Sequence, residues 1–146
     1  MKITRAFLPS AVLAFLLLTL LSVSMCSASP VPMSEISIGG ISYHASADYV
    51  KSIYGEPDKL TTSDGSAIYA GVFQTYIYGN TFKVEIGGNQ VIHVSTTANN
   101  GLGTPAGVTV GMDKKILESL YGLPKNVIRD KNHNTIGYYY RSEQSD

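Results

Sequence analysis

The stretch Gly40-Ile-Ser-Tyr-His-Ala-Ser-Ala-Asp-Tyr-Val-Lys-Ser-Ile-Tyr-Gly-Glu-Pro57 returns later in the chain as Gly107-Val-Thr-Val-Gly-Met-Asp-Lys-Lys-Ile-Leu-Glu-Ser-Leu-Tyr-Gly-Leu-Pro124. The two stretches align without gaps at a constant offset of 67, and 5 of their 18 residues are identical. Average residue usage would give about one identity by chance. We therefore interpret the chain as carrying an internal repeat.

Each stretch has the signals that start and stop a short helix. Ser46 and Asp113 occupy equivalent positions, and both residue types accept hydrogen bonds from free backbone N–H groups at a helix start. Gly55 and Gly122 suit the left-handed conformation that ends a helix, and a proline two residues later prevents its continuation. Each helix is expected to bury one apolar face, formed by Tyr49, Val50, Ile53 and Tyr54 in the first copy and by Ile116, Leu117, Leu120 and Tyr121 in the second.

After the first helix the hydrophobic pattern changes to a period of two, which is typical of strands. Ile92 and Val94 are expected to face the core from the last of these strands. The predicted fold class is therefore α+β, with tandem units of a short helix packed on an antiparallel β-meander. The three strands of the first meander are expected at residues 67–78, 81–86 and 90–97.

The second unit is expected to be incomplete. The first unit covers residues 40–97, a polar and glycine-rich linker follows at 98–106, and the second unit covers 107–146. After its helix, the second unit has one predicted strand, at residues 135–141, and no counterpart of two strands of the first. This C-terminal strand is expected to be an exposed edge, open to strand addition or self-association.

The first residues of the chain indicate export. A charged start precedes the uncharged apolar residues 6–23, and small residues follow. This pattern is typical of a signal peptide, predicted at residues 1–28 with cleavage after Ala28. Two alternatives stay open: an uncleaved membrane anchor, since 18 apolar residues can span a bilayer, and a lipid anchor at Cys26. Residues 29–39 then form an N-terminal linker.

Composition and motif spacing favour a protein without enzymatic activity. The 11 basic and 11 acidic side chains give zero net charge, which argues against a nucleic-acid partner. His44, His93 and His133 have no second ligand at the spacing of a metal site. We find no catalytic pair, nucleophile motif or phosphate-binding loop, so no catalytic, cofactor-binding or metal-binding residue is assigned and no cofactor is expected.

Aromatic residues are the feature with functional potential. The chain has ten Tyr and four Phe, and several fall on predicted strands, where they can serve as ordinary strand formers. Consecutive strand residues point to opposite faces, so the run of three tyrosines near the C-terminus must place some rings outward. Tyrosine is also enriched at protein interfaces. The predicted partner-binding face comprises Tyr69, Phe73, Tyr76, Tyr78, Tyr138, Tyr139 and Tyr140.

The motifs Val108–Asp113, Leu120–Pro124 and Tyr138–Tyr140, with their partners in the first repeat, resemble a known superfamily. The pattern is similar to the β-lactamase-inhibitory-protein repeat and to the related small outer-membrane lipoprotein (SmpA/OmlA) module. The resemblance covers about residues 40–146. It implies tandem units that form an α+β saddle, whose concave sheet surface grips a partner protein.

Two functions from different classes follow. The first is an exported, non-catalytic protein-interaction module of the bacterial cell envelope, which binds a partner protein through the tyrosine-rich sheet face. The alternative is a protein that binds a small molecule or a cell-wall glycan with the same face. Contact with a membrane is expected only through the signal segment or through lipidation at Cys26.

Overall fold

The computed structural model describes residues 30–64 and 71–142, so the predicted signal segment, Cys26 and Tyr69 lie outside the described residues. Within these described ranges the fold consists of two α-helices, a short 3-10 helix and antiparallel strands, which confirms the α+β class. The helices are η2 (Met33–Glu35), α2 (Ala47–Tyr54) and α3 (Lys114–Tyr121). The strands are β1 (Ser37–Ile38), β2 (Ile41–Ser42), β3 (Lys59–Asp64), β4 (Val72–Tyr78), β5 (Phe82–Gly87), β6 (Gln90–Thr96), β7 (Asn126–Arg129) and β8 (Thr135–Tyr139).

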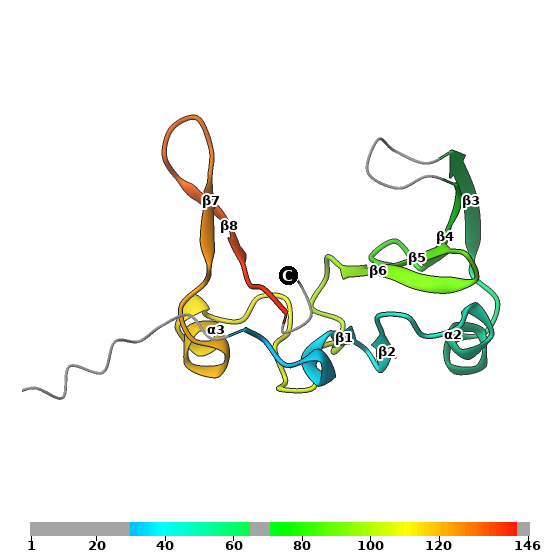
Figure 1. Ribbon diagram of the computed structural model, residues 1–146, viewed down its shortest axis with the longest axis horizontal. Helices are drawn as coiled ribbons and strands as arrows, with labels where there is room; N and C mark the ends of the chain where they lie inside the picture. The colour runs from blue at the N-terminus through cyan, green and yellow to red at the C-terminus, as the bar shows by residue number, and fades with distance from the viewer. Residues whose placement is uncertain (1–29, 65–70, 143–146) are drawn as a thin grey trace, which may run out of the picture.

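The described strands form three separate antiparallel sheets. The largest has the order β3-β4-β5-β6, and the two smaller ones are the hairpins β1-β2 and β7-β8. Figure 1 shows the hairpins β3-β4 and β7-β8 standing at opposite ends of an elongated molecule, with α2 and α3 below them and β1-β2 between the two ends. We call residues 37–96 the first lobe and residues 114–140 the second lobe.

Both helices begin and end as the sequence predicts. The Ser46 hydroxyl accepts a hydrogen bond of 3.1 Å from the Tyr49 N–H, and the Asp113 carboxylate accepts one of 2.8 Å from the Lys115 N–H. Gly55 and Gly122 have φ values of 78° and 74°, in the region where a side chain is strained. The predicted caps and the positive φ of both glycines are therefore confirmed.

The hydrophobic core lies in the first lobe, between α2 and the four-stranded sheet. Ile41, Val50, Val84 and Val91 are completely buried, and Phe82 and Ile86 are nearly so. Burying an aliphatic side chain of this size stabilises a fold by roughly 1.5–3 kcal/mol. Helix α3 has no buried residue, and the second lobe contributes none to the core.

Each helix buries fewer residues than the sequence analysis predicted. Tyr49 and Ile53 are 45% and 53% exposed, and their counterparts Ile116 and Leu120 are 46% and 45% exposed. Each of these residues lies one position before a residue that packs inward, which is about 100° around a helix. A helix of eight residues presents only one narrow stripe to the sheet, so Val50 and the partly buried Tyr54 make the contact in α2.

Four of the described strands, β1, β2, β3 and β7, were not predicted. Strand β3 pairs along its whole length with β4, so the first meander has four strands rather than three. Strand β7 pairs with β8, so the second unit has a hairpin rather than a single strand. The range 29–39, expected as a linker, contains η2 and β1. Of the expected strand 67–78, residues 71–78 are described, and strand β4 begins there at Val72.

A β-bulge changes the orientation of side chains along β6. Glu85 pairs with His93 and Ile86 with Val91, which leaves Ile92 as the extra residue. Val91 is completely buried, and Val94 packs against the core as predicted. The prediction that Ile92 faces the core is wrong, because the bulge places Ile92 and His93 together on the outer face of the sheet.

Candidate binding surface

The aromatic residues of β4 do not share one face. Side chains alternate along a strand, so Tyr76 and Tyr78 point toward α2 and Phe73 points to the opposite, outer face of the sheet. Tyr76 is only 5% exposed and belongs to the core, with the Lys51 ammonium 5.6 Å from its ring centre. Tyr76 is therefore removed from the predicted partner-binding face.

Tyr78 has a structural role in the first lobe. Its ring centre lies 5.4 Å from that of Tyr54 and 6.1 Å from that of Phe82, and its hydroxyl donates a hydrogen bond of 3.0 Å to the Gly55 carbonyl. Burial raises the pKa of the Tyr78 phenol, which keeps this donor neutral. The ring therefore holds the end of α2 against the sheet instead of facing a partner.

The three tyrosines at the end of the second lobe also divide between two faces. The Tyr140 ring centre lies 5.9 Å from that of Tyr121 on α3, and its hydroxyl donates a hydrogen bond of 3.3 Å to the Gly122 carbonyl. Alternation places Tyr138 on the same side, toward the helix. Tyr139 is on the other side and is 47% exposed. Of the described residues in the predicted face, Phe73 and Tyr139 lie on the outward side.

The outer face of the four-stranded sheet contains a hollow of about 430 Å³. Phe73 and Ile92 line it, and both side chains lie beside Gly87, where an added Cβ would meet the Phe73 ring at 3.0 Å. Glu85 and His93 face each other across β5 and β6, with Glu85 Oε1 3.5 Å from His93 Nδ1. The remaining lining residues are Ser63, Asp64 and Thr75.

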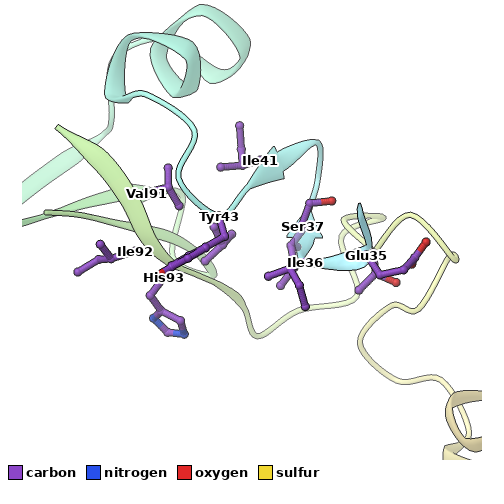
Figure 2. Close-up of a pocket in the computed structure, with 11 residues that line it drawn as sticks. Glu35, Ile36, Ser37, Ile41, Tyr43, Val91, Ile92 and His93 are labelled. Atoms are coloured by element: carbon purple, nitrogen blue, oxygen red, sulfur yellow. The ribbon is translucent and has the colours of Figure 1, made fainter. Parts of the chain in front are cut away.

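A second hollow, of about 280 Å³, adjoins the first at Ile92 and His93. It lies between β6 and the segment that runs from η2 through β2, and Figure 2 shows side chains of both borders lining the space between them. Its walls are mostly apolar and include Ile36, Ile41 and Tyr43. The Tyr43 ring is 40% exposed and stacks on His44 with 3.9 Å between ring centres.

A third hollow, of about 460 Å³, continues toward the second lobe. It shares Ile36 and Tyr43 with the second hollow and is also lined by Tyr139 and Tyr140. The three hollows therefore form one row from Phe73 on β4 to Tyr139 on β8. We call this row the groove.

Glu35 fixes the middle of the groove to the second lobe. Its carboxylate accepts hydrogen bonds from the Ala106 N–H at 2.9 Å and from the Tyr121 hydroxyl at 3.0 Å. The Tyr121 hydroxyl also lies 2.6 Å from the Thr104 hydroxyl, and burial raises its pKa. Both bonds are accepted by Oε2 of Glu35, so this side chain connects segments that are far apart in the sequence.

The groove has both polar and apolar lining residues. In the part of the chain that the structure describes, no group of three or more His, Cys, Asp or Glu side chains could hold a metal ion. His93 faces Glu85, and His44 stacks on Tyr43. The aromatic and apolar members of the lining, such as Tyr43, Phe73 and Ile92, are suited to bind apolar or aromatic side chains.

Sequence reasoning missed Ile36, Tyr43, Ile92 and His93. A signal for the first two was present, because Ile36-Ser-Ile38 and Ile41-Ser-Tyr43 alternate on either side of Gly39-Gly40, which is a pattern typical of a hairpin. For Ile92 and His93 the sequence has no comparable signal. The bulge that turns both outward depends on the pairing of β5 with β6.

Comparison of the chain with family models, with curated proteins and with solved structures finds no match. The resemblance to the inhibitory-protein repeat and the lipoprotein module therefore stays a prediction from short motifs. Among residues 30–64 and 71–142, no helix has the length and apolar character needed to cross a membrane.

Proposed function

We propose that this chain is an exported, non-catalytic protein-interaction module of the bacterial cell envelope, and that its partner protein binds along the groove. The observation that carries the proposal is that three neighbouring hollows share lining residues. Their lining includes the exposed Tyr43 and Tyr139 and the partly buried Phe73 and Ile92. Export and envelope location are proposed from the sequence of residues 1–28 alone.

Two properties of the groove favour a protein partner. Tyrosine and phenylalanine contribute large contact areas with few rotatable bonds, and they are enriched in the centres of protein interfaces. The groove is also preformed, since Phe73 and Ile92 extend from paired strands and Tyr43 directly follows β2. A preformed surface loses little conformational entropy on binding.

The alternative is a small-molecule or cell-wall-glycan ligand. The middle hollow of about 280 Å³ favours it, because apolar walls with a few polar groups at the rim are typical of small-ligand sites. Glu35, Ser37 and Thr104 supply those polar groups. A ligand of this kind would occupy the middle hollow, whereas a protein partner would contact the whole groove.

The two exposed tyrosines Tyr43 and Tyr49 provide a matched test. Tyr43 lies in the groove and is 40% exposed, whereas Tyr49 lies on α2 outside the lining residues and is 45% exposed. In affinity capture from envelope extract of the producing bacterium, wild type and Tyr49→Ala should retain one protein in stoichiometric amount, and Tyr43→Ala should lose it.

Native mass spectrometry of the same preparations identifies the other outcomes. Capture of a small molecule by wild type without any protein would support the alternative. Retention of the protein by Tyr43→Ala, with its loss in Tyr49→Ala, would place the interface on α2 and would refute the groove. Circular dichroism of both variants checks that each keeps the wild-type fold.

A further inference from the structure

Three aromatic rings close the end of α2 in the first lobe. The ring centre of Phe82 lies 4.9 Å from that of Tyr54 and 6.1 Å from that of Tyr78, and Tyr54 and Tyr78 are 5.4 Å apart. Phe82 is the first residue of β5 and pairs directly with Tyr78 across the sheet. Phe82, the third ring, therefore belongs to β5, the strand that pairs with the edge of β4.

The second lobe repeats two of these three rings. Tyr121 and Tyr140 are 5.9 Å apart, and the Tyr140 hydroxyl bonds to Gly122 as the Tyr78 hydroxyl bonds to Gly55. Strand β8 pairs only with β7 among the described residues, and no third described ring packs against Tyr121 and Tyr140.

The course of the chain after β8 differs from its course after β4. After Tyr78 the chain turns at Gly79 and returns as β5, with the Gly79 N–H bonded to the Asp58 carboxylate at 2.6 Å. After Tyr140 the Arg141 carbonyl instead accepts a hydrogen bond from the Val31 N–H, and Ser142 pairs with Val31. These contacts lie beyond the strand, so they leave the β8 edge along Thr135–Tyr139 without a partner strand in the described part of the chain.

We propose that β8 binds an extended segment of another protein, which adds to the sheet as an antiparallel strand. Its first residue is aromatic and packs against Tyr121 and Tyr140, and apolar residues follow at alternate positions. Strand β5 is the template for this chemistry, because its Phe82, Val84 and Ile86 are the residues that cover the equivalent edge in the first lobe. Backbone hydrogen bonds give such an added strand affinity, and the alternating side chains give it specificity.

The surroundings of the edge fit an apolar strand. Residues 135–140 carry no charge, and charged residues are what natural edge strands use to prevent pairing. Ile136 is 65% exposed. A second copy of this chain cannot supply its own β5, since that strand is already paired with β4 and β6. The inference is independent of the groove proposal, because strand addition at β8 does not require the groove to bind anything.

A peptide with the sequence of residues 80–88, Asn-Thr-Phe-Lys-Val-Glu-Ile-Gly-Gly, is the probe. We expect fluorescence anisotropy to show saturable binding of the labelled peptide to the full chain. Replacing the phenylalanine of the peptide, Phe82→Ala, should weaken binding about tenfold, since the aromatic contact is lost while the folded protein is untouched. Hydrogen exchange should show protection that appears on peptide addition at residues 135–140.

Two matched protein variants locate the site. Ile136→Lys places a charge on β8, and Val72→Lys places one on β4, at positions that are 65% and 60% exposed. Ile136→Lys should abolish peptide binding and Val72→Lys should leave it unchanged. Tyr43→Ala should also leave it unchanged, which separates this inference from the groove.

Three results would overturn the inference. The first is the absence of saturable peptide binding, and the second is equal binding of the Phe82→Ala peptide. The third is protection of residues 135–140 that rises with protein concentration and is unaffected by the peptide, because this would show that a second copy covers the edge.

Discussion

The hydroxyl of Tyr78 donates a hydrogen bond of 3.0 Å to the carbonyl oxygen of Gly55, the residue that ends α2. Helix ends leave backbone carbonyls without partners, and this bond satisfies one of them from a strand 23 residues later. The Tyr140 hydroxyl and the Gly122 carbonyl form the same relationship at the end of α3, at 3.3 Å. The common construction supports the interpretation of the two segments as repeats, which stays a prediction.

Tyr78→Phe removes this hydroxyl while keeping the ring. The bond is partly exposed to solvent, so the free energy of unfolding should fall by about 1 kcal/mol. Urea unfolding followed by circular dichroism measures the change, and Tyr49→Phe serves as the control, with a change near zero. Equal stability of Tyr78→Phe and wild type would contradict a stabilising role for the bond.

Gly55→Ala and Gly122→Ala should each lower the free energy of unfolding by about 1 kcal/mol. Neither glycine has an atom within 4 Å of an added Cβ, so the cost comes from the positive φ alone. The control is Gly137→Ala on β8, where φ is not positive and the added Cβ meets Ile128 at an ordinary 3.5 Å. Thermal unfolding compares the three variants, and a loss in Gly137→Ala as large as the others would argue against the backbone explanation.

Val50→Ala and Leu117→Ala compare equivalent positions in the two helices. Val50 is completely buried, so its truncation should cost about 2 kcal/mol. Leu117 is only partly buried, and its truncation should cost less although more atoms are removed. Chemical unfolding of both variants measures the difference. A larger loss for Leu117→Ala would mean that the second lobe has a core of its own.

The fold should lose stability at alkaline pH. Burial raises the pKa of Tyr54, Tyr78, Tyr121 and Tyr140 above the ordinary 10.0, so folding favours the neutral phenols. Their contribution is complete below pH 10.0, where unfolded tyrosines are also neutral, and it decreases as the pH rises above 10.0 toward the raised values.

The measurement is the denaturant midpoint at neutral pH and at a pH above 10.0, with Tyr78→Phe and Tyr140→Phe as controls. Each variant should lose less stability on alkalinisation than wild type, because one titrating phenol is absent. Ultraviolet absorbance of tyrosinate follows the ionisation directly. An alkaline loss that is identical in all three proteins would assign the effect to other groups.

Local signals of the sequence predicted the helices well. Ser46, Gly55 and their counterparts act through the backbone next to them, so their effect can be inferred without knowledge of distant contacts. The outward and inward pattern of β5 was also predictable, because Phe82, Val84 and Ile86 alternate with charged residues.

The remaining features depend on tertiary pairing. Strand β3, with the sequence Lys-Leu-Thr-Thr-Ser-Asp, is exposed throughout and lacks an alternating pattern, and only its pairing with β4 makes it a strand. The bulge beside Ile92 arises between two strands and is not encoded in either alone. The predicted partner-binding face combined residues from both faces of the sheet. A helix decides which sheet face is covered, and the sequence does not show on which face each helix lies.

The confinement of the core to the first lobe has a consequence for the motions of the molecule. The second lobe has no buried residue in α3, and its hairpin has large exposed side chains such as Ile128 and Ile136. Regions with few buried contacts open at a lower free energy than the whole protein. The amides of β7 and β8 should therefore exchange with solvent through a sub-global opening that leaves β4, β5 and β6 intact. A partner strand bound at the β8 edge would raise the protection of the amides in the second lobe to that of the first lobe.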